Sequence, residues 1–349
     1  MVLINITPLP SFVISALVAV NYMKNIMLTI KPIINILAPT ILISLSSSLV
    51  NADTSVTPMK IYAQAPLHSN TLSTELRSAF AMKEESVELF AAGTIASVWA
   101  NSDSFNLDYY QNQVITGAQW QLTPKMKAEL KYQYNYAGNN GLDSFVHGFH
   151  DFFGIGQNGR DEVENDRFNI SVPKYGVEIN DFEGETLSSA LHSYFEYQVF
   201  ANQYNAISLG ASLYFNHVNS GSFKRDSFEQ GLQANYSFSY EKHALFSTLG
   251  MTFRDNGFNS SLPYKNSTTA FALGYGYAIT PSNHIVTSYH VYEGALDDSG
   301  DYSEASHEYV LGYRYLLEKA AFELSVIENA VNMDNSTDIA FTFGVRYVL

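Results

Sequence analysis

The chain has 349 residues, no cysteine, and 34 acidic against 19 basic residues, which gives a net charge of -15. The lack of cysteine excludes a disulfide scaffold, a thiolate metal site and a thiol nucleophile. The acidic balance argues against a nucleic-acid partner, because binding phosphates requires clustered Lys and Arg. Charged residues make up only 15% of the chain, while 24 Tyr and 23 Phe are present. This composition is typical of a secreted or outer-membrane protein rich in strands.

Residues 1–52 have the features of an export signal. They contain Lys24 and Lys31 but no acidic residue, and an apolar run over 33–45 follows the two lysines. That run is shorter than the ~20 residues needed to cross a bilayer. We therefore expect cleavage after Ala52, with Met23 as an alternative start of translation.

Alternation with period two dominates the chain beyond residue 86 and predicts strands. In the last segment, Phe341, Phe343 and Tyr347 alternate with Thr342 and Arg346. One face is apolar and the other is small or polar, which is typical of an all-β transmembrane antiparallel barrel with a wet lumen. A soluble sandwich shows the same alternation, but the export signal and the tyrosine content favour the barrel.

Turn chemistry predicts about twelve strands in a barrel over 86–349. We expect them near 86–101, 104–122, 125–137, 188–202, 204–218, 227–240, 242–256, 267–280, 283–296, 303–316, 318–331 and 335–349. Residues 53–85 are then an N-terminal luminal or periplasmic segment. Promoting 68–82 and 167–180 to strands gives fourteen as the alternative.

One long outer loop changes to a helical period. Its apolar residues recur at spacings of three and four, which predicts a short amphipathic helix; they are Leu142, Phe145, Val146, Phe149, Phe152 and Phe153. A helix this apolar is not expected to face water. We expect it to fold into the barrel mouth, although packing against lipid or a partner stays open.

The same loop carries a motif with Gly141-Leu142-Asp143, Gly148-Phe149-His150-Asp151, Phe153-Gly154 and Gly159-Arg160. In this block the chain resembles a family of uncharacterised proteobacterial outer-membrane proteins, known only as a domain of unknown function. Where that family tends to have Gly-Gly before the arginine, this chain has Asn158-Gly159, and only Leu107-Asp108 matches an acidic stretch of the family. The resemblance implies an outer-membrane location but no activity.

The candidate ligand or gating residues lie in this block: His147, Phe149, His150, Asp151, Phe153 and Arg160. A histidine beside carboxylates can act as a general base, as in an outer-membrane lipid-modifying enzyme. The histidines could also share a metal. The interpretation we favour is that His150 and Asp151 tether the helix, so we assign no catalytic residue, no metal and no cofactor.

A second group of charges falls on the polar faces of predicted strands: Lys127, Glu129, Lys131, His192, Glu196, Arg314, Glu323 and Arg346. Open diffusion channels appear at about 16 to 18 strands, so a narrower lumen with paired charges should be plugged or gated. We predict passage or binding of a small solute. The alternatives are a lipid-modifying enzyme and a structural surface protein. The expected partners are outer-membrane lipid, lipopolysaccharide and the barrel-assembly machinery.

Overall fold

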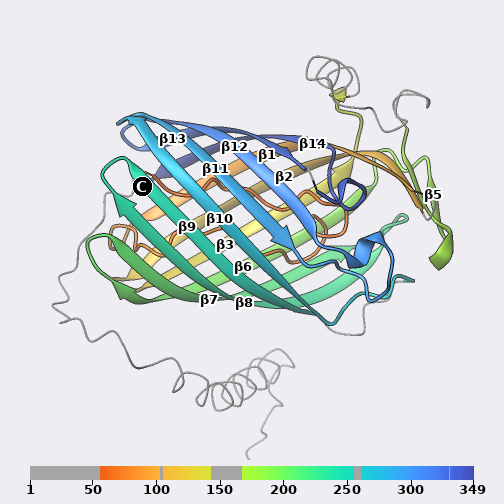
Figure 1. Cartoon of the computed structure of the whole chain (residues 1–349), viewed down its shortest axis with the longest axis horizontal. Helices are drawn as coiled ribbons and strands as arrows, with labels where there is room; N and C mark the ends of the chain where they lie inside the picture. Colours follow the sequence, from red (N-terminus) through yellow and green to blue (C-terminus); the bar gives the residue numbers. More distant parts are fainter. Residues whose placement is uncertain (1–55, 103–104, 143–166, 255–260, 330) are drawn as a thin grey trace, which may run out of the picture. The chain divides into compact units, whose positions relative to one another are not determined.

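The alternating segments form antiparallel strands that close into a barrel (Figure 1). The structure, a computed structural model, describes residues 56–102, 105–142, 167–254, 261–329 and 331–349. Each strand pairs with its neighbours in the order β1-β14-β13-β12-β11-β10-β9-β8-β7-β6-β3-β2, and β2 also pairs with β1. The prediction of a barrel of twelve strands is confirmed.

The barrel strands are β1 (Val87–Ser102), β2 (Phe105–Thr123), β3 (Met126–Ala137), β6 (Thr186–Ala201), β7 (Asn205–Val218), β8 (Arg225–Tyr240), β9 (His243–Arg254), β10 (Ser267–Thr280), β11 (Asn283–Tyr292), β12 (Ser306–Leu316), β13 (Ala320–Glu328) and β14 (Ile339–Val348). Short connections and the C-terminus lie at one end of the barrel, which we call the turn end. The connections at the opposite end, the loop end, are longer, apart from the one between β1 and β2. The register between β1 and β14 runs from Glu88↔Val348 to Ser97↔Ile339 and closes the wall.

Two further strands, β4 (Asn169–Val172) and β5 (Val177–Asn180), form a hairpin beside the loop end of β2. The 3-10 helix η2 (Pro173–Tyr175) joins them, and Gly176 follows it with φ +64. Residues 68–82 contain no strand. The alternative of fourteen barrel strands is therefore wrong, because Pro173 and Gly176 break the alternation of 167–180 into two short pieces.

Short 3-10 helices occur in two loops, η3 (Asp301–Ser303) and η4 (Met333–Asn335). Within the described residues, no helix combines the length and the hydropathy needed to cross a membrane.

The outer face of the wall is apolar and the inner face is polar. Leu249 is 59% exposed and Leu324 is 56% exposed, whereas Arg314 and Glu229 are 1% and 0% exposed. A soluble sandwich buries its apolar face, so this arrangement excludes it. Exposed tyrosines near the turn end, such as Tyr240 and Tyr315, match the aromatic girdle of membrane barrels.

Two predicted features lie outside the described residues. The export signal covers 1–52, and the candidates from His147 to Arg160 fall within 143–166. Of the predicted helix, the described part is Leu142, which is buried. The charges on strand faces are all described.

Candidate functional site

Residues 56–86, here called the luminal segment, run inside the barrel (Figure 1). At the turn end, the Thr57 carbonyl accepts a hydrogen bond of 2.9 Å from Arg314. Near the loop end, the Gln64 and Ala65 amides donate to the Glu308 carboxylate at 2.7 and 2.8 Å. The segment therefore crosses from one end of the barrel toward the other.

The segment then reverses in a tight turn over 65–71, where the Ser69 amide donates to the Ala65 carbonyl at 2.8 Å. On the way back, the Arg77 amide donates to the Thr248 hydroxyl at 3.2 Å, and the Ala79 amide donates to Ser237 at 2.8 Å. These side chains supply the partners that backbone groups inside a barrel require.

The returning part of the segment, residues 72–76, packs against glycines on the barrel wall. A Cβ placed on Gly250 would lie 2.8 Å from the Cβ of Thr74, closer than two side chains can approach. Similar contacts occur at alternate residues of the segment on successive strands: Leu72 at Gly231 of β8, Thr74 at Gly250 of β9, and Leu76 at Gly274 of β10. The missing side chains thus make room for the segment.

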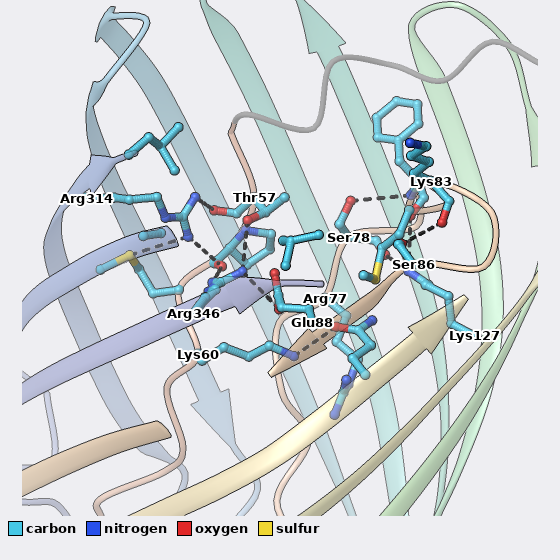
Figure 2. A pocket seen from close by; sticks show the side chains of 18 of the residues that line it. Thr57, Lys60, Arg77, Ser78, Lys83, Ser86, Glu88, Lys127, Arg314 and Arg346 are labelled. Carbon is cyan, nitrogen blue, oxygen red and sulfur yellow. Dashed lines mark hydrogen bonds and ion pairs between the residues drawn. The ribbon is translucent and has the colours of Figure 1, made fainter. Parts of the chain in front are cut away.

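An ionic cluster at the turn end holds the start of the segment, and Figure 2 shows its two arginines, Arg314 and Arg346, beside Thr57. Both arginines contact the Glu323 carboxylate, at 2.6 and 2.8 Å. Arg314 donates to the Thr57 carbonyl at 2.9 Å and to the Pro58 carbonyl at 3.0 Å, and Arg346 also donates to Pro58. One buried carboxylate therefore serves two guanidinium groups that grip the backbone of the segment.

A second cluster uses charges of the segment itself. The Arg77 guanidinium donates hydrogen bonds to both carboxylate oxygens of Glu129, at 2.8 and 3.1 Å. It also lies 3.3 Å from the Glu75 carboxylate. Lys60 reaches the same Glu129 carboxylate at 2.5 Å. The Arg77 guanidinium also stacks on the Tyr194 ring, 3.9 Å from its centroid. Such bidentate, charge-assisted contacts are among the strongest that side chains make.

Lysines of the wall complete these contacts. Lys131 pairs with Glu75 of the segment, and His192 lies 3.6 Å from the same carboxylate. Lys127 pairs with Glu196 at 2.7 Å and donates to the Ser78 carbonyl at 2.6 Å.

The structure thus places all eight predicted luminal charges inside the barrel, where they are buried. Sequence reasoning missed that many of their partners come from the luminal segment. Lys60, Glu75 and Arg77 supply those partner charges, and Glu308 of β12 and the Glu229–Arg254 pair, at 2.8 Å, also escaped notice. The signal available was the placement of charges in a stretch that also alternates apolar residues, such as Leu72 and Leu76.

Two cavities flank the luminal segment. The cavity at the turn end has a volume of about 340 Å³, and its lining mixes cations such as Lys60, Arg77 and Arg346 with carboxylates such as Glu88 (Figure 2). The cavity at the loop end has a volume of about 260 Å³ and is lined by residues 66, 67 and 70 of the turn. The segment borders both cavities and lies between them. Among the described residues, no group of three or more His, Asp or Glu could hold a metal ion.

A contact beside the loop-end cavity joins the β4–β5 hairpin to the loop after β11. Asp298 accepts hydrogen bonds from Lys174, at 2.9 Å, and from the Tyr175 hydroxyl. Partial burial would raise the pKa of Asp298, but hydrogen bonds from Tyr175, the Gly300 amide and Lys174 outweigh it and lower the pKa below its usual range.

Comparison with solved structures finds outer-membrane barrels. The COG4313 outer membrane channel from Pseudomonas putida F1 has a TM-score of 0.48 and 14% identity, over 79% of this chain and 99% of that chain. The NanC porin has a TM-score of 0.43 and 8% identity, over 74% and 98%. The Pseudomonas putida toluene transporter TodX has a TM-score of 0.36 and 8% identity, over 77% and 90%. No curated protein matches the chain.

A family model described as "Protein of unknown function (DUF3187)" matches residues 33–349. The resemblance inferred from the sequence is confirmed at this level. The chain belongs to this family of proteins of unknown function.

Proposed function

We propose that the chain is an integral outer-membrane barrel that passes or binds a small solute, and that the luminal segment controls the passage. The observation that carries the proposal is the position of this segment between two cavities, held there by buried ionic contacts. The apolar outer face supports a location in lipid, because exposed leucines such as Leu249 are stable there and not in water.

The orientation follows from the turns. Bacterial outer-membrane barrels have short turns on the periplasmic side and longer loops outside. The turn-end cavity then opens toward the periplasm and the loop-end cavity toward the exterior. Lipid and lipopolysaccharide contact the apolar face, and the barrel-assembly machinery inserts the chain.

The ionic contacts favour a closed state that opens as a unit. Removing one partner of a buried ion pair costs about 3 to 5 kcal/mol, because the other charge stays buried without compensation. Undocking of the luminal segment would leave Glu129 of the wall without Arg77 and Lys60. Water entering the opened lumen would then solvate these groups, so opening and solvation occur together.

A disulfide lock tests this gate. The chain has no cysteine, so the double variant Thr74→Cys, Gly250→Cys carries a single pair of thiols. The Cβ atoms at these positions are about 2.8 Å apart, and a movement of about 1 Å reaches the Cβ separation of a disulfide. We expect the reduced form to pass a small sugar into proteoliposomes and the oxidised form to pass none.

The matched control places a disulfide in the wall. Thr94 and Thr342 face each other on β1 and β14, with their hydroxyl oxygens 2.8 Å apart. Oxidation of Thr94→Cys, Thr342→Cys should leave solute flux unchanged. Equal flux through oxidised and reduced Thr74→Cys, Gly250→Cys protein would refute control by the segment.

The lipid-modifying alternative depends on His147 and His150, which lie outside the described residues. Hydrolysis of phospholipid by purified protein, abolished by His150→Ala, would replace the passage proposal with that alternative.

A further inference from the structure

We infer that the cavity at the loop end is a binding site for a small, uncharged, apolar molecule. The inference rests on the proposed function only in one respect, namely that the bound molecule affects solute passage. Binding to the cavity has its own argument and its own test.

The walls of this cavity are apolar on several sides. Strand β2 contributes Leu107 and Tyr109, the β4–β5 hairpin contributes Ile170 and Val177, and the loops contribute Leu262 and Tyr302. Several of these side chains also belong to, or pack against, one buried apolar cluster. A pocket lined in this way offers dispersion contacts and no strong competition from water.

The volume sets the size of the ligand. An engineered apolar cavity of about 150 Å³ stays dry and binds benzene, and drug-sized ligands need about 300 Å³ or more. At about 260 Å³, the cavity fits a single substituted ring or a molecule of similar bulk.

The apolar part of the cavity disfavours a charged ligand. The cations in the lining are Lys224, which is exposed, and Arg225, which is half-buried and already donates to the Asn70 carbonyl. A carboxylate that entered beyond these two side chains would have to give up its hydration among apolar groups, which is costly.

The luminal segment forms one side of the cavity. Pro66, Leu67 and Asn70 line the cavity, and the Ser69 carbonyl between them accepts hydrogen bonds from Gln133 and Asn135 at 2.8 and 2.7 Å. A bound molecule therefore contacts the wall and the docked segment together.

Fluorine NMR of the full protein in nanodiscs tests this site. The probes are fluorobenzene and its charged analogue 4-fluorobenzoate, with empty nanodiscs as the reference for partition into lipid. Leu262→Trp fills the cavity, and Leu249→Trp makes the same change on the outer face of β9, where the side chain is exposed. A heat-modifiable band on gels reports that each variant is folded.

We expect the protein to broaden the fluorobenzene signal beyond the empty nanodiscs, and toluene to reverse the broadening. Leu262→Trp should lower the affinity at least tenfold, and Leu249→Trp should leave it unchanged. Equal binding by both variants, no binding by the native protein, or stronger binding of 4-fluorobenzoate would overturn the inference. Binding of fluorobenzene without any effect of the disulfide lock on flux would keep this site and reject the gate, and the reverse result would do the opposite.

Discussion

The carboxylate of Glu129 gives the sharpest prediction, because it joins the wall to two cations of the luminal segment. Glu129→Gln keeps the size of the side chain but removes the charge that Arg77 and Lys60 contact at 2.8 and 2.5 Å. Breaking a buried pair costs about 3 to 5 kcal/mol. We expect about 3 kcal/mol, because Glu75 still lies 3.3 Å from Arg77.

A cost of about 3 kcal/mol raises the undocked population roughly 100-fold. Hydrogen exchange measures that population, since the Arg77 and Ala79 amides are protected by Thr248 and Ser237 in the docked state. We expect exchange over 72–79 to accelerate by this factor and solute flux to rise. Glu241→Gln in an exposed turn is the control. Exchange within about threefold of the native rate, with a heat-stable barrel, would refute the role of this contact.

Three further changes follow from the same structure. Gly250→Val should displace Thr74 and raise exchange over 72–79 about tenfold, an overpacking cost of about 1 to 3 kcal/mol, while Gly93→Val, with nothing within 4 Å of its added Cβ, should not. Leu324→Arg, on the lipid face, should destabilise the folded barrel by about 2 to 4 kcal/mol in urea titrations; no change would reject the face assignment. The Asp298 contact, with its lowered pKa, is present above the usual carboxylate pKa and is lost as pH falls through the folded value. Asp298→Asn should therefore weaken fluorobenzene binding up to about fivefold at pH 7 and not at all below that value.

The barrel could be predicted from the sequence because every strand has one face toward lipid and one face toward the lumen. Residues such as Phe343 and Leu324 must face lipid, and Arg346 and Glu323 must then face the lumen, so period two carries both the fold and the direction of each side chain. Turn residues mark where one strand ends and the next begins, so the number of strands could be counted from the sequence as well. The hairpin of β4 and β5 does not show this long alternation, because it lies beside the barrel wall and is not part of it.

The contacts of the luminal segment could not be predicted from the sequence. Arg77 and Glu129 are 52 positions apart, and nothing in their neighbours specifies that one carboxylate serves both Arg77 and Lys60. The contacts of the segment with the wall glycines can be recognised only after the register of β8, β9 and β10 is known. Without that register, Gly250 and Gly274 are simply small residues of a polar face. Long-range pairing of this kind depends on topology and not on local pattern.

The apolar cavity and the ionic segment together predict how a ligand acts on the gate. Leu67 of the docked segment lines the cavity. Undocking would remove this contact, so we expect an apolar ligand to bind the docked state better than the undocked one. By linkage, a ligand at 100 times its dissociation constant then stabilises docking by up to about 2.7 kcal/mol. The Ser69 amide, which donates to the Ala65 carbonyl at 2.8 Å, should exchange up to about 100-fold more slowly with saturating fluorobenzene, and sugar flux should fall. Leu262→Trp should remove both effects. If saturating fluorobenzene leaves the exchange of Ser69 unchanged, the ligand does not distinguish docked from undocked protein, and the coupling between cavity and gate is rejected.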